Sequence, residues 1–463
     1  MFSNFFKTFG NCFKIPELKS RIIFTLSLLA VCRLLAYIRI PGLNGAALSH
    51  YFNTQSGNTN GLLGMYNTFA GGAYENCAVG SLGIMPYISA TIIIQLLQAV
   101  WPSLSKLARE ENGRTKIVQY GRYLTVLLCI GQGAYFANNW LNPGQAFGSG
   151  FTDQLVLIQN HWIYFIDAVT VMTAGTMLLM WLGEQITERG IGNGVSLVIT
   201  VGILARLPNA YNGLQNMFFP SSGEPTHSWL GTGLLLVILL FVVVGGVIAI
   251  TQAQRKIPVQ YASRMIGQKM YQGGNNFMPL RVNYAGVMPI IFASSILMFP
   301  QPVLSWLAAH ISAPFLQEKI RALATYMNYG SWMYMLIYSL MILFFSYFWV
   351  ATQFNEIQIA DDLKKNGGYI PGVRPGQATA EYLHKTMSRI TLAGALFLTL
   401  IAAMPIVLSK KLDIDQNVAG FFGGTSVLIA VGVLLDTMRQ IESHLMMRNY
   451  DGFLKKGRVR GRF

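Results

Sequence analysis

The chain has 463 residues, of which 52% are hydrophobic and only 11% are charged, whereas soluble domains carry about 25% charged residues. This composition excludes an ordinary soluble protein. The apolar residues fall in runs of about 20, the length at which an α-helix crosses a bilayer, so the sequence predicts a polytopic membrane protein. The net charge of +15 would suit nucleic-acid binding, but cations in cytoplasmic loops explain it in a membrane protein.

Ten apolar segments are predicted to span the membrane. They cover residues 21–38, 80–99, 117–137, 162–183, 194–207, 229–251, 283–299, 331–353, 390–408 and 424–441. The first segment lacks a small-residue cleavage site and is interpreted as a retained helix rather than a signal peptide. An even number of spans places both termini on one side.

The distribution of charge indicates which side that is. Most of the 34 Lys and Arg residues lie in the termini and in alternate loops, which predicts that both termini are cytoplasmic. Few cations fall in the other loops, namely Arg39, Arg206, Lys319, Arg321, Lys410 and Lys411. Within those outer loops, residues 303–325 are partly apolar and are expected to form a helix in the outer interface.

The four cysteines are scattered, with no CxxC pair and no histidine cluster beside them. They are Cys12, Cys32, Cys77 and Cys129. This arrangement supports neither a metal site nor a disulfide framework, and no cofactor is expected.

Residues 82–97 form an apolar span with unusual interruptions. Gly83 and Pro86 lie near its start, and polar side chains follow at Ser89, Thr91 and Gln95. The segment 61–72 before it is rich in small residues and too short to span. We interpret this helix as half of a gate, because a helix that faced only lipid would not carry polar side chains along its length.

Aliphatic side chains recur at helical spacing on two of the segments. Ile84 and Ile88 share one helix face, as do Val195 and Ile199. They could be ordinary packing residues or part of a hydrophobic constriction that blocks ions and water. The intramembrane charges Arg33, Asp167 and Asp436 are interpreted as structural pairs or snorkelling groups rather than a proton relay.

Two cytoplasmic loops, 252–282 and 354–389, are far longer than a simple connection needs. The second contains residues 366–376, whose Gly and Pro bracket Arg374 in what resembles a rigid hairpin tip. A docking surface is favoured, and a plain solvated loop remains the alternative.

Long ordered motifs resemble the SecY family of protein-translocation channels, in its bacterial form. They are GIMPYISA at 83–90, WLGEQITERGIGNG at 181–194, NYAGVMPIIFASS at 283–295, ADDLKK at 360–365, PGVRPG at 371–376 and FGGTS at 422–426. The chain departs from the family pattern at Asn355-Glu356, where relatives often have Asn-Pro, and at 251–254, where an acidic residue is missing.

The resemblance implies an all-α membrane protein with ten transmembrane helices in two inverted five-helix halves around a central pore. The halves would be 21–207 and 208–441, flanked by a cytoplasmic segment 1–20 and a basic tail 442–463. With five spans each, the halves must have opposite orientations, and inverted repeats place a pathway at their interface.

The resemblance also implies roles for individual residues. The pore ring would be Ile84, Ile88, Val195, Ile199, Ile291 and Ile429. The plug, at about 61–72, would include Leu62, Leu63, Gly64, Met65, Phe69, Gly71 and Gly72. The lateral gate would include Ser89, Gln95, Gln132, Ser294, Ser295 and Phe299. Partner docking would use Arg255, Lys256, Arg264, Lys364, Lys365 and Arg374.

The implied function is a passive channel in the bacterial plasma membrane, not an enzyme. Its implied partners are the small subunits SecE and SecG, the motor ATPase SecA, the ribosome, signal sequences and nascent chains, membrane lipid, YidC and SecDF. Two other classes of protein are alternatives. A secondary transporter would need a polar midplane site, and a membrane enzyme would need clustered His, Asp or Cys; neither pattern is present in the sequence.

Overall fold

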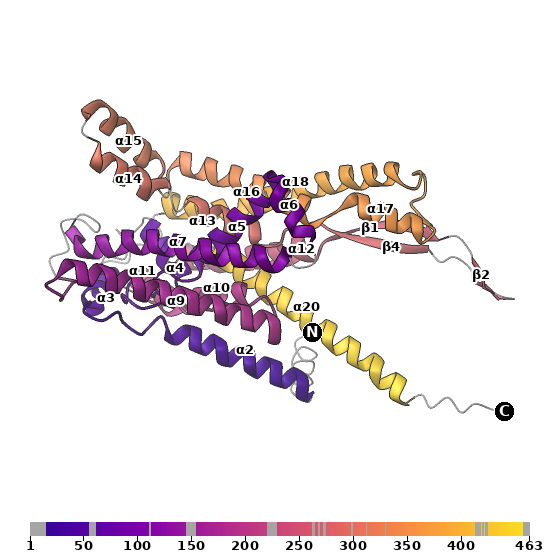
Figure 1. Cartoon of the computed structure of the whole chain (residues 1–463), viewed down its shortest axis with the longest axis horizontal. Coiled ribbons are helices and arrows are strands. Elements are labelled where there is room, and N and C mark those ends of the chain that lie inside the picture. Colours follow the sequence, from indigo (N-terminus) through magenta and orange to yellow (C-terminus); the bar gives the residue numbers. More distant parts are fainter. Residues whose placement is uncertain are drawn as a thin grey trace. The chain divides into compact units, whose positions relative to one another are not determined.

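The computed structural model describes residues 15–54, 62–110, 113–144, 154–219, 229–261, 264–266, 269–271, 275–297, 300–311, 313–328, 330–412, 418, 421 and 425–456. Helices dominate these residues (Figure 1). Contacts divide the chain into two compact units, one of Met1–Ser221 with Ile429–Phe463 and the other of Ser222–Leu428.

The first unit consists mainly of helices, with turns and two isolated β-bridges, Arg39 with Ala78 and Leu43 with Val156. Its helices are α2 (Pro16–Leu34), α3 (Gly45–Thr54), α4 (Leu62–Phe69), α5 (Met85–Val100), α6 (Pro102–Arg109), α7 (Gly113–Leu141), α9 (His161–Arg189), α10 (Gly194–Leu204) and α11 (Leu207–Phe218), with most of α20 (Thr425–Lys456). Helix α9 packs against α2, α7 and α10, and α5 packs against α7. The short helix α4 touches α10.

The second unit combines helices with a small sheet. Its elements are η1 (Trp229–Gly233), α12 (Leu234–Gln252), β1 (Gln254–Tyr261), β2 (Arg264–Ile266), β3 (Lys269–Tyr271), β4 (Asn275–Arg281), α13 (Met288–Leu297), α14 (Pro300–His310), α15 (Pro314–Tyr326), α16 (Trp332–Gln353), α17 (Glu356–Lys365), β5 (Gly368–Tyr369) and α18 (Gln377–Leu412). Helix α16 packs between α13 and α18. In Figure 1 the α14–α15 pair lies at one end of α16 and the sheet lies beyond the other.

Each of the ten predicted spans overlaps a described helix. Taken singly, 5 helical stretches of the described chain are long and apolar enough to cross a membrane, and 6 if the bent pair α5 and α6 counts as one. The bend is 106° and has a local cause: Trp101 precedes Pro102 and adopts an extended conformation, as residues before proline do. The protein is therefore a multi-pass, largely helical membrane protein, and ten remains the predicted number of spans.

The loop 252–282 contains strands that the all-α prediction did not include. Strand β1 pairs antiparallel with β4, from Gln254 opposite Arg281 to Gln260 opposite Asn275, and β5 joins the other edge of β1. Ile257 and Val259 are both buried, as the period of two in a strand requires. Ile257 packs in one cluster with residues of β4, α16, α18 and the loops beside them, namely Leu280, Val350, Phe354, Ile370 and Leu383.

Helix α20 returns to the first unit. Ile441 and Leu445 pack against Leu18 and Ile191, and the Gly192 amide donates to the side-chain oxygen of Gln440 at 2.7 Å. The compact units differ from the predicted halves 21–207 and 208–441 in two places: α11 and most of α20 belong to the first unit. The division into inverted halves stays a prediction.

Candidate functional site

The predicted plug, residues 62–72 and here called the plug segment, is a short helix followed by a tight glycine turn. Gly71 and Gly72 have φ of 66° and 83°, a left-handed conformation that glycine adopts without strain. A Cβ added to Gly71 would lie 2.8 Å from Cα of Gly202 on α10. The predicted plug therefore rests with its backbone directly against α10, and a larger residue at position 71 would push it away.

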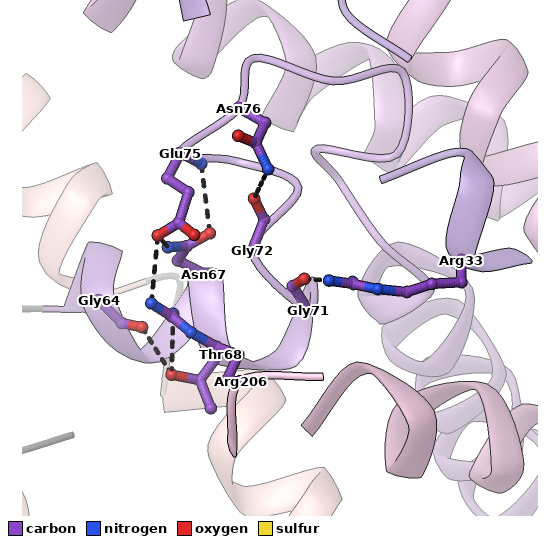
Figure 2. Close-up of polar contacts among 9 residues, drawn as sticks. All are labelled: Arg33, Gly64, Asn67, Thr68, Gly71, Gly72, Glu75, Asn76 and Arg206. Carbon is purple, nitrogen blue, oxygen red and sulfur yellow. Dashed lines mark hydrogen bonds and ion pairs between the residues drawn. The ribbon is translucent and has the colours of Figure 1, made fainter. Parts of the chain in front are cut away.

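An ion pair links this region to the end of α10. Nη2 of Arg206 lies 3.1 Å from Oε2 of Glu75, and the two side chains are 12% and 14% exposed. Nη1 of Arg206 also donates to the Thr68 hydroxyl at 3.4 Å, and Asn67 donates through Nδ2 to the same Glu75 oxygen at 2.6 Å. Figure 2 shows the four side chains converging. We call Asn67, Thr68, Glu75 and Arg206 the latch.

A second arginine holds the plug segment from α2. Arg33 donates from Nη1 to the carbonyl oxygen of Gly71, as Figure 2 shows, and from Nη2 to the Tyr37 hydroxyl at 3.1 Å. From the sequence, Arg33 is expected to be a structural pair or a snorkelling group. The structure gives Arg33 a partner in the plug segment, Gly71, and the α2 sequence alone does not indicate which partner that is.

Tyr66 anchors the short helix α4 on its apolar side. Its hydroxyl donates to the Leu82 carbonyl at 2.7 Å, and its ring meets Phe136 edge-on at 4.7 Å between centroids. Near the same region, burial raises the pKa of the Cys77 thiol to about 12, although Arg39 acts in the opposite direction. The turn after the plug is therefore dry and closely packed.

A cavity of about 30 Å³ lies between the plug segment, α2 and α10. Arg33, Phe69, Ile84, Val198 and Gly202 contribute to its wall. It is large enough to hold a water molecule. Packing around the plug segment is therefore incomplete on this side, and fewer atoms attract it there than in a fully packed core.

Two predicted ring residues come together within the first unit. A Cβ added to Gly183 on α9 would lie 3.6 Å from both Ile84 Cδ1 and Val195 Cγ2. Ile88 and Ile199 are almost completely buried, and so is Ile429 in α20. Ile291, also buried, belongs to the second unit. The complete ring therefore stays a prediction.

The predicted gate residues occupy α5, α7 and α13. Ser89 is buried, and Gln95 and Gln132 are half-buried. The hydroxyls of Ser294 and Ser295 both donate to the Ile291 carbonyl, at 2.9 and 2.8 Å. These bonds use a backbone acceptor of the same helix, so α13 needs no partner helix to satisfy them. Phe299 lies outside the described residues, and the gate assignment stays a prediction.

The predicted docking cations gather at one end of the second unit. Arg255 and Lys256 are exposed on β1, and Lys364 and Lys365 are exposed in the last turn of α17. Arg374 is exposed in the turn after β5. Its carbonyl accepts from the Thr379 hydroxyl at 2.9 Å, and the Val373 amide donates to Ile370 at 3.0 Å, so the turn is held in one shape.

Other predicted residues are only partly described. The backbone of Leu62, Leu63 and Met65 belongs to α4, and that of Arg264 belongs to β2, but their side chains fall outside the described part. Cys12 and the basic residues beyond 456 also lie outside it. In the described ranges no group of three or more His, Cys, Asp or Glu side chains could hold a metal ion.

The latch was not predicted from the sequence. In the sequence, Arg206 is distinguished only as one of the few cations in the predicted outer loops, and no motif marks Glu75. That shortage of outer charge is a usable signal, because an isolated Arg and an isolated Glu on the same side of a membrane protein have few other partners.

Comparisons with known proteins identify the family of this chain. Residues 78–438 match the family model described as SecY. Protein translocase subunit SecY of Chlamydia trachomatis is 43% identical over 98% of this chain and 99% of the relative. The Escherichia coli subunit of the same name is 40% identical over 96% of each chain.

Solved structures show the same fold. One titled "The structure of a protein conducting channel" covers 95% of this chain and 94% of its own, with a TM-score of 0.57 and 17% identity. Another, with a TM-score of 0.55 and 16% identity, concerns a plug domain that is said to stabilise the closed state of the SecY channel. The identity and coverage of the sequence relatives confirm the resemblance in the motifs: the chain belongs to the SecY family.

Proposed function

We propose that the chain is the central channel subunit of a bacterial Sec translocon, which passes unfolded secretory polypeptides across the plasma membrane. The plug segment is the observation that carries this proposal. Its helix of 8 residues is too short to cross a bilayer, and the latch and Arg33 hold it beside Ile84 and α10. A short segment held by a few polar contacts suits a part that must leave a pathway.

In this proposal the ring of Ile84, Ile88, Val195, Ile199, Ile291 and Ile429 closes around the moving chain. Aliphatic side chains fit many sequences without binding any of them, and an apolar constriction excludes water and ions. The plug segment covers this ring when no substrate is present. The pore makes no covalent change in its substrate.

The lateral gate would open between α5 and α13. Small polar side chains such as Ser89, Ser294 and Ser295 give helix–helix contacts of about 1 kcal/mol, which exchange readily. A signal sequence is an apolar helix that can enter this seam and reach lipid. Transmembrane segments of substrates would leave the channel by the same route.

The proposed partners follow from the exposed cations of the second unit. Arg255, Lys256, Lys364, Lys365 and Arg374 would meet the motor SecA or the ribosome, whose rRNA phosphates bind Lys and Arg in a salt-dependent way. SecE and SecG would flank the helices, and YidC and SecDF would act beside them. Both termini would lie in the cytoplasm, because most cations occupy that side.

Replacing Ile88 and Ile291 with asparagine tests the pore. Polar side chains would hydrate the constriction, so we expect ion conductance in planar bilayers and export of proteins with defective signal sequences. Leu127→Asn is the matched control, because Leu127 is 65% exposed on α7 and lies outside the predicted ring. Unchanged conductance in the double variant would rule out the ring assignment.

A further inference from the structure

Helix α15 carries an exposed apolar face that no other part of the described chain covers. Phe315, Leu316, Leu323 and Tyr326 are between 47% and 71% exposed. Positions 315, 316, 319, 322, 323 and 326 fall on one side of a helix with 3.6 residues per turn. This group, which we call the α15 apolar face, also contains Lys319.

The other sides of α15 have different characters. Ala324 is buried, and Gln317 and Ile320 are half-buried, on the side where α15 packs with α14. Glu318, Arg321 and Thr325 are exposed and form a third, polar side. The helix is thus divided into a packed side, a polar side and an apolar face, which is the pattern of helices that lie in a membrane interface.

The end of α15 is joined to the start of a membrane span. The Ser331 hydroxyl donates to the Tyr326 carbonyl and accepts from the Tyr334 amide at 3.0 Å, so one side chain connects the last residue of α15 to the first turn of α16. Helix α16 belongs to a stretch long and apolar enough to cross a membrane. The junction therefore lies where that span enters the bilayer.

The lipid-facing side of α16 starts at this same junction. Trp332, Leu336, Leu340 and Phe344 are spaced four residues apart and are between 51% and 76% exposed. Such a row on a spanning helix faces hydrocarbon, and a tryptophan at its end is typical of the membrane boundary. The α15 apolar face is only a few residues away along the chain, so both surfaces meet the same lipid.

The position of Lys319 indicates that lipid, rather than another protein, covers the α15 apolar face. Its Nζ lies 5.6 Å from the centroid of the Phe315 ring, in the middle of the apolar face. Lysine is depleted in the cores of protein–protein interfaces. In a membrane interface, however, its aliphatic stem lies along apolar neighbours while the ammonium reaches phosphate groups.

From these observations we propose that α15 lies in the phospholipid head-group region at the start of α16, with its apolar face against the acyl chains and Lys319 among the phosphates. On the proposed topology this is the outer leaflet. The helix anchors the beginning of α16 at a set depth, in addition to any role of the chain in translocation.

Site-directed spin labelling of the full chain in phospholipid vesicles tests this placement. Cys12, Cys32, Cys77 and Cys129 are replaced by alanine, and one label is introduced at Leu323→Cys on the apolar face. Thr325→Cys on the polar side is the matched control, and Leu340→Cys on α16 reports a lipid-facing site. Accessibility to oxygen, which concentrates in lipid, is compared with accessibility to a water-soluble nickel chelate.

We expect the ratio of oxygen to nickel accessibility to be several-fold higher at position 323 than at position 325, and to approach the value at position 340. Equal ratios at 323 and 325 with strong nickel accessibility would show a solvated helix and overturn the proposal. Protection of position 323 from both reagents would indicate a protein partner and would also overturn it. A label at Phe315→Cys repeats the measurement should the Leu323 variant fail to insert.

Discussion

Arg206 and Glu75 are 131 residues apart in the sequence, yet their side chains form an ion pair 3.1 Å long at the edge of the plug segment. Arg206 ends the α10 region, and Glu75 lies in the turns that follow the plug. Neither side chain is more than 14% exposed. The pair is therefore partly shielded from water, and the loss of one partner would leave a charge with poor solvation.

Replacing Glu75 with glutamine should release the plug segment. Removing one member of a buried ion pair costs about 3–5 kcal/mol of stability. In this protein the change would weaken the contacts of Glu75 and Arg206 with Asn67 and Thr68 in the plug segment. We expect more ion leakage through the idle channel and export of substrates with weak signal sequences. Planar-bilayer conductance and a secretion assay measure these effects.

Glu184→Gln is the matched control for this prediction. Glu184 on α9 pairs with Arg122 on α7 at 2.6 Å, and neither residue belongs to the plug segment or to the latch. This variant should leave conductance unchanged. Equal leakage from both variants, or none from Glu75→Gln, would contradict a specific latch at Arg206.

The Cys77 thiol should resist alkylation while the plug is in place. Burial raises its pKa from 9.0 to about 12, and the thiolate is the reactive form. The pKa of Cys77 is higher in the folded protein than in the unfolded chain. The free energy of unfolding therefore keeps the full contribution of the neutral thiol below about pH 9, and it loses this contribution as the pH rises towards 12. We therefore expect slow maleimide labelling at neutral pH.

Labelling of Cys77 should accelerate when a substrate chain occupies the pore, because displacement of the plug exposes the turn. Cys77→Ala supplies the background, and mass spectrometry separates this site from the other cysteines. An identical rate in idle and substrate-filled channels would show that the turn at Cys77 stays closed during transport.

Reversing the charge of Arg374 should stop secretion without preventing membrane insertion. Arg374 is exposed, and the bond from Thr379 goes to its carbonyl rather than its guanidinium, so Arg374→Glu keeps the turn and changes only the presented charge. Arg321→Glu, at the other end of the same unit, is the control. Normal export by Arg374→Glu would exclude the docking role.

The pair between Glu356 and His384 should link α17 to α18 weakly. Nδ1 of His384 lies 2.7 Å from Oε1 of Glu356, but the His384 side chain is 72% exposed. Exposed pairs of this kind contribute about 0–1 kcal/mol. Glu356→Gln should modestly increase hydrogen exchange in α17 alone, and His384→Ala should have the same effect. A large change across the sheet as well would mean that the pair supports more than one helix.

Glu356 also shows how a departure from a family pattern can be understood structurally. It stands at the first residue of α17, where the resemblance leads us to expect proline, and Asn355 caps the helix by accepting from the Gln358 amide at 3.2 Å. An acidic residue in the first turn suits the positive end of a helix. The helix therefore begins at this position without the proline.

The sequence by itself determined the class of protein and where its apolar helices lie in the chain. Apolar runs are local, and a run of sufficient length must become a helix because lipid offers no partner for backbone amides. Each of the ten segments accordingly overlaps a helix. The motifs were long enough to identify the family, and the spacing of Ile84 with Ile88 pointed to a shared face.

Only the tertiary structure decided which side chains hold the plug and which surfaces remain uncovered. The pairing of Arg206 with Glu75, the bond from Arg33 to Gly71 and the strands β1 and β4 depend on segments far apart in the chain, and no local pattern specifies such contacts. The same holds for α15: its sequence shows an amphipathic helix, but only packing against α14 reveals which apolar side chains stay exposed. The physical reason is that helix formation follows from neighbouring residues, whereas polar contacts between distant segments follow from how the helices pack.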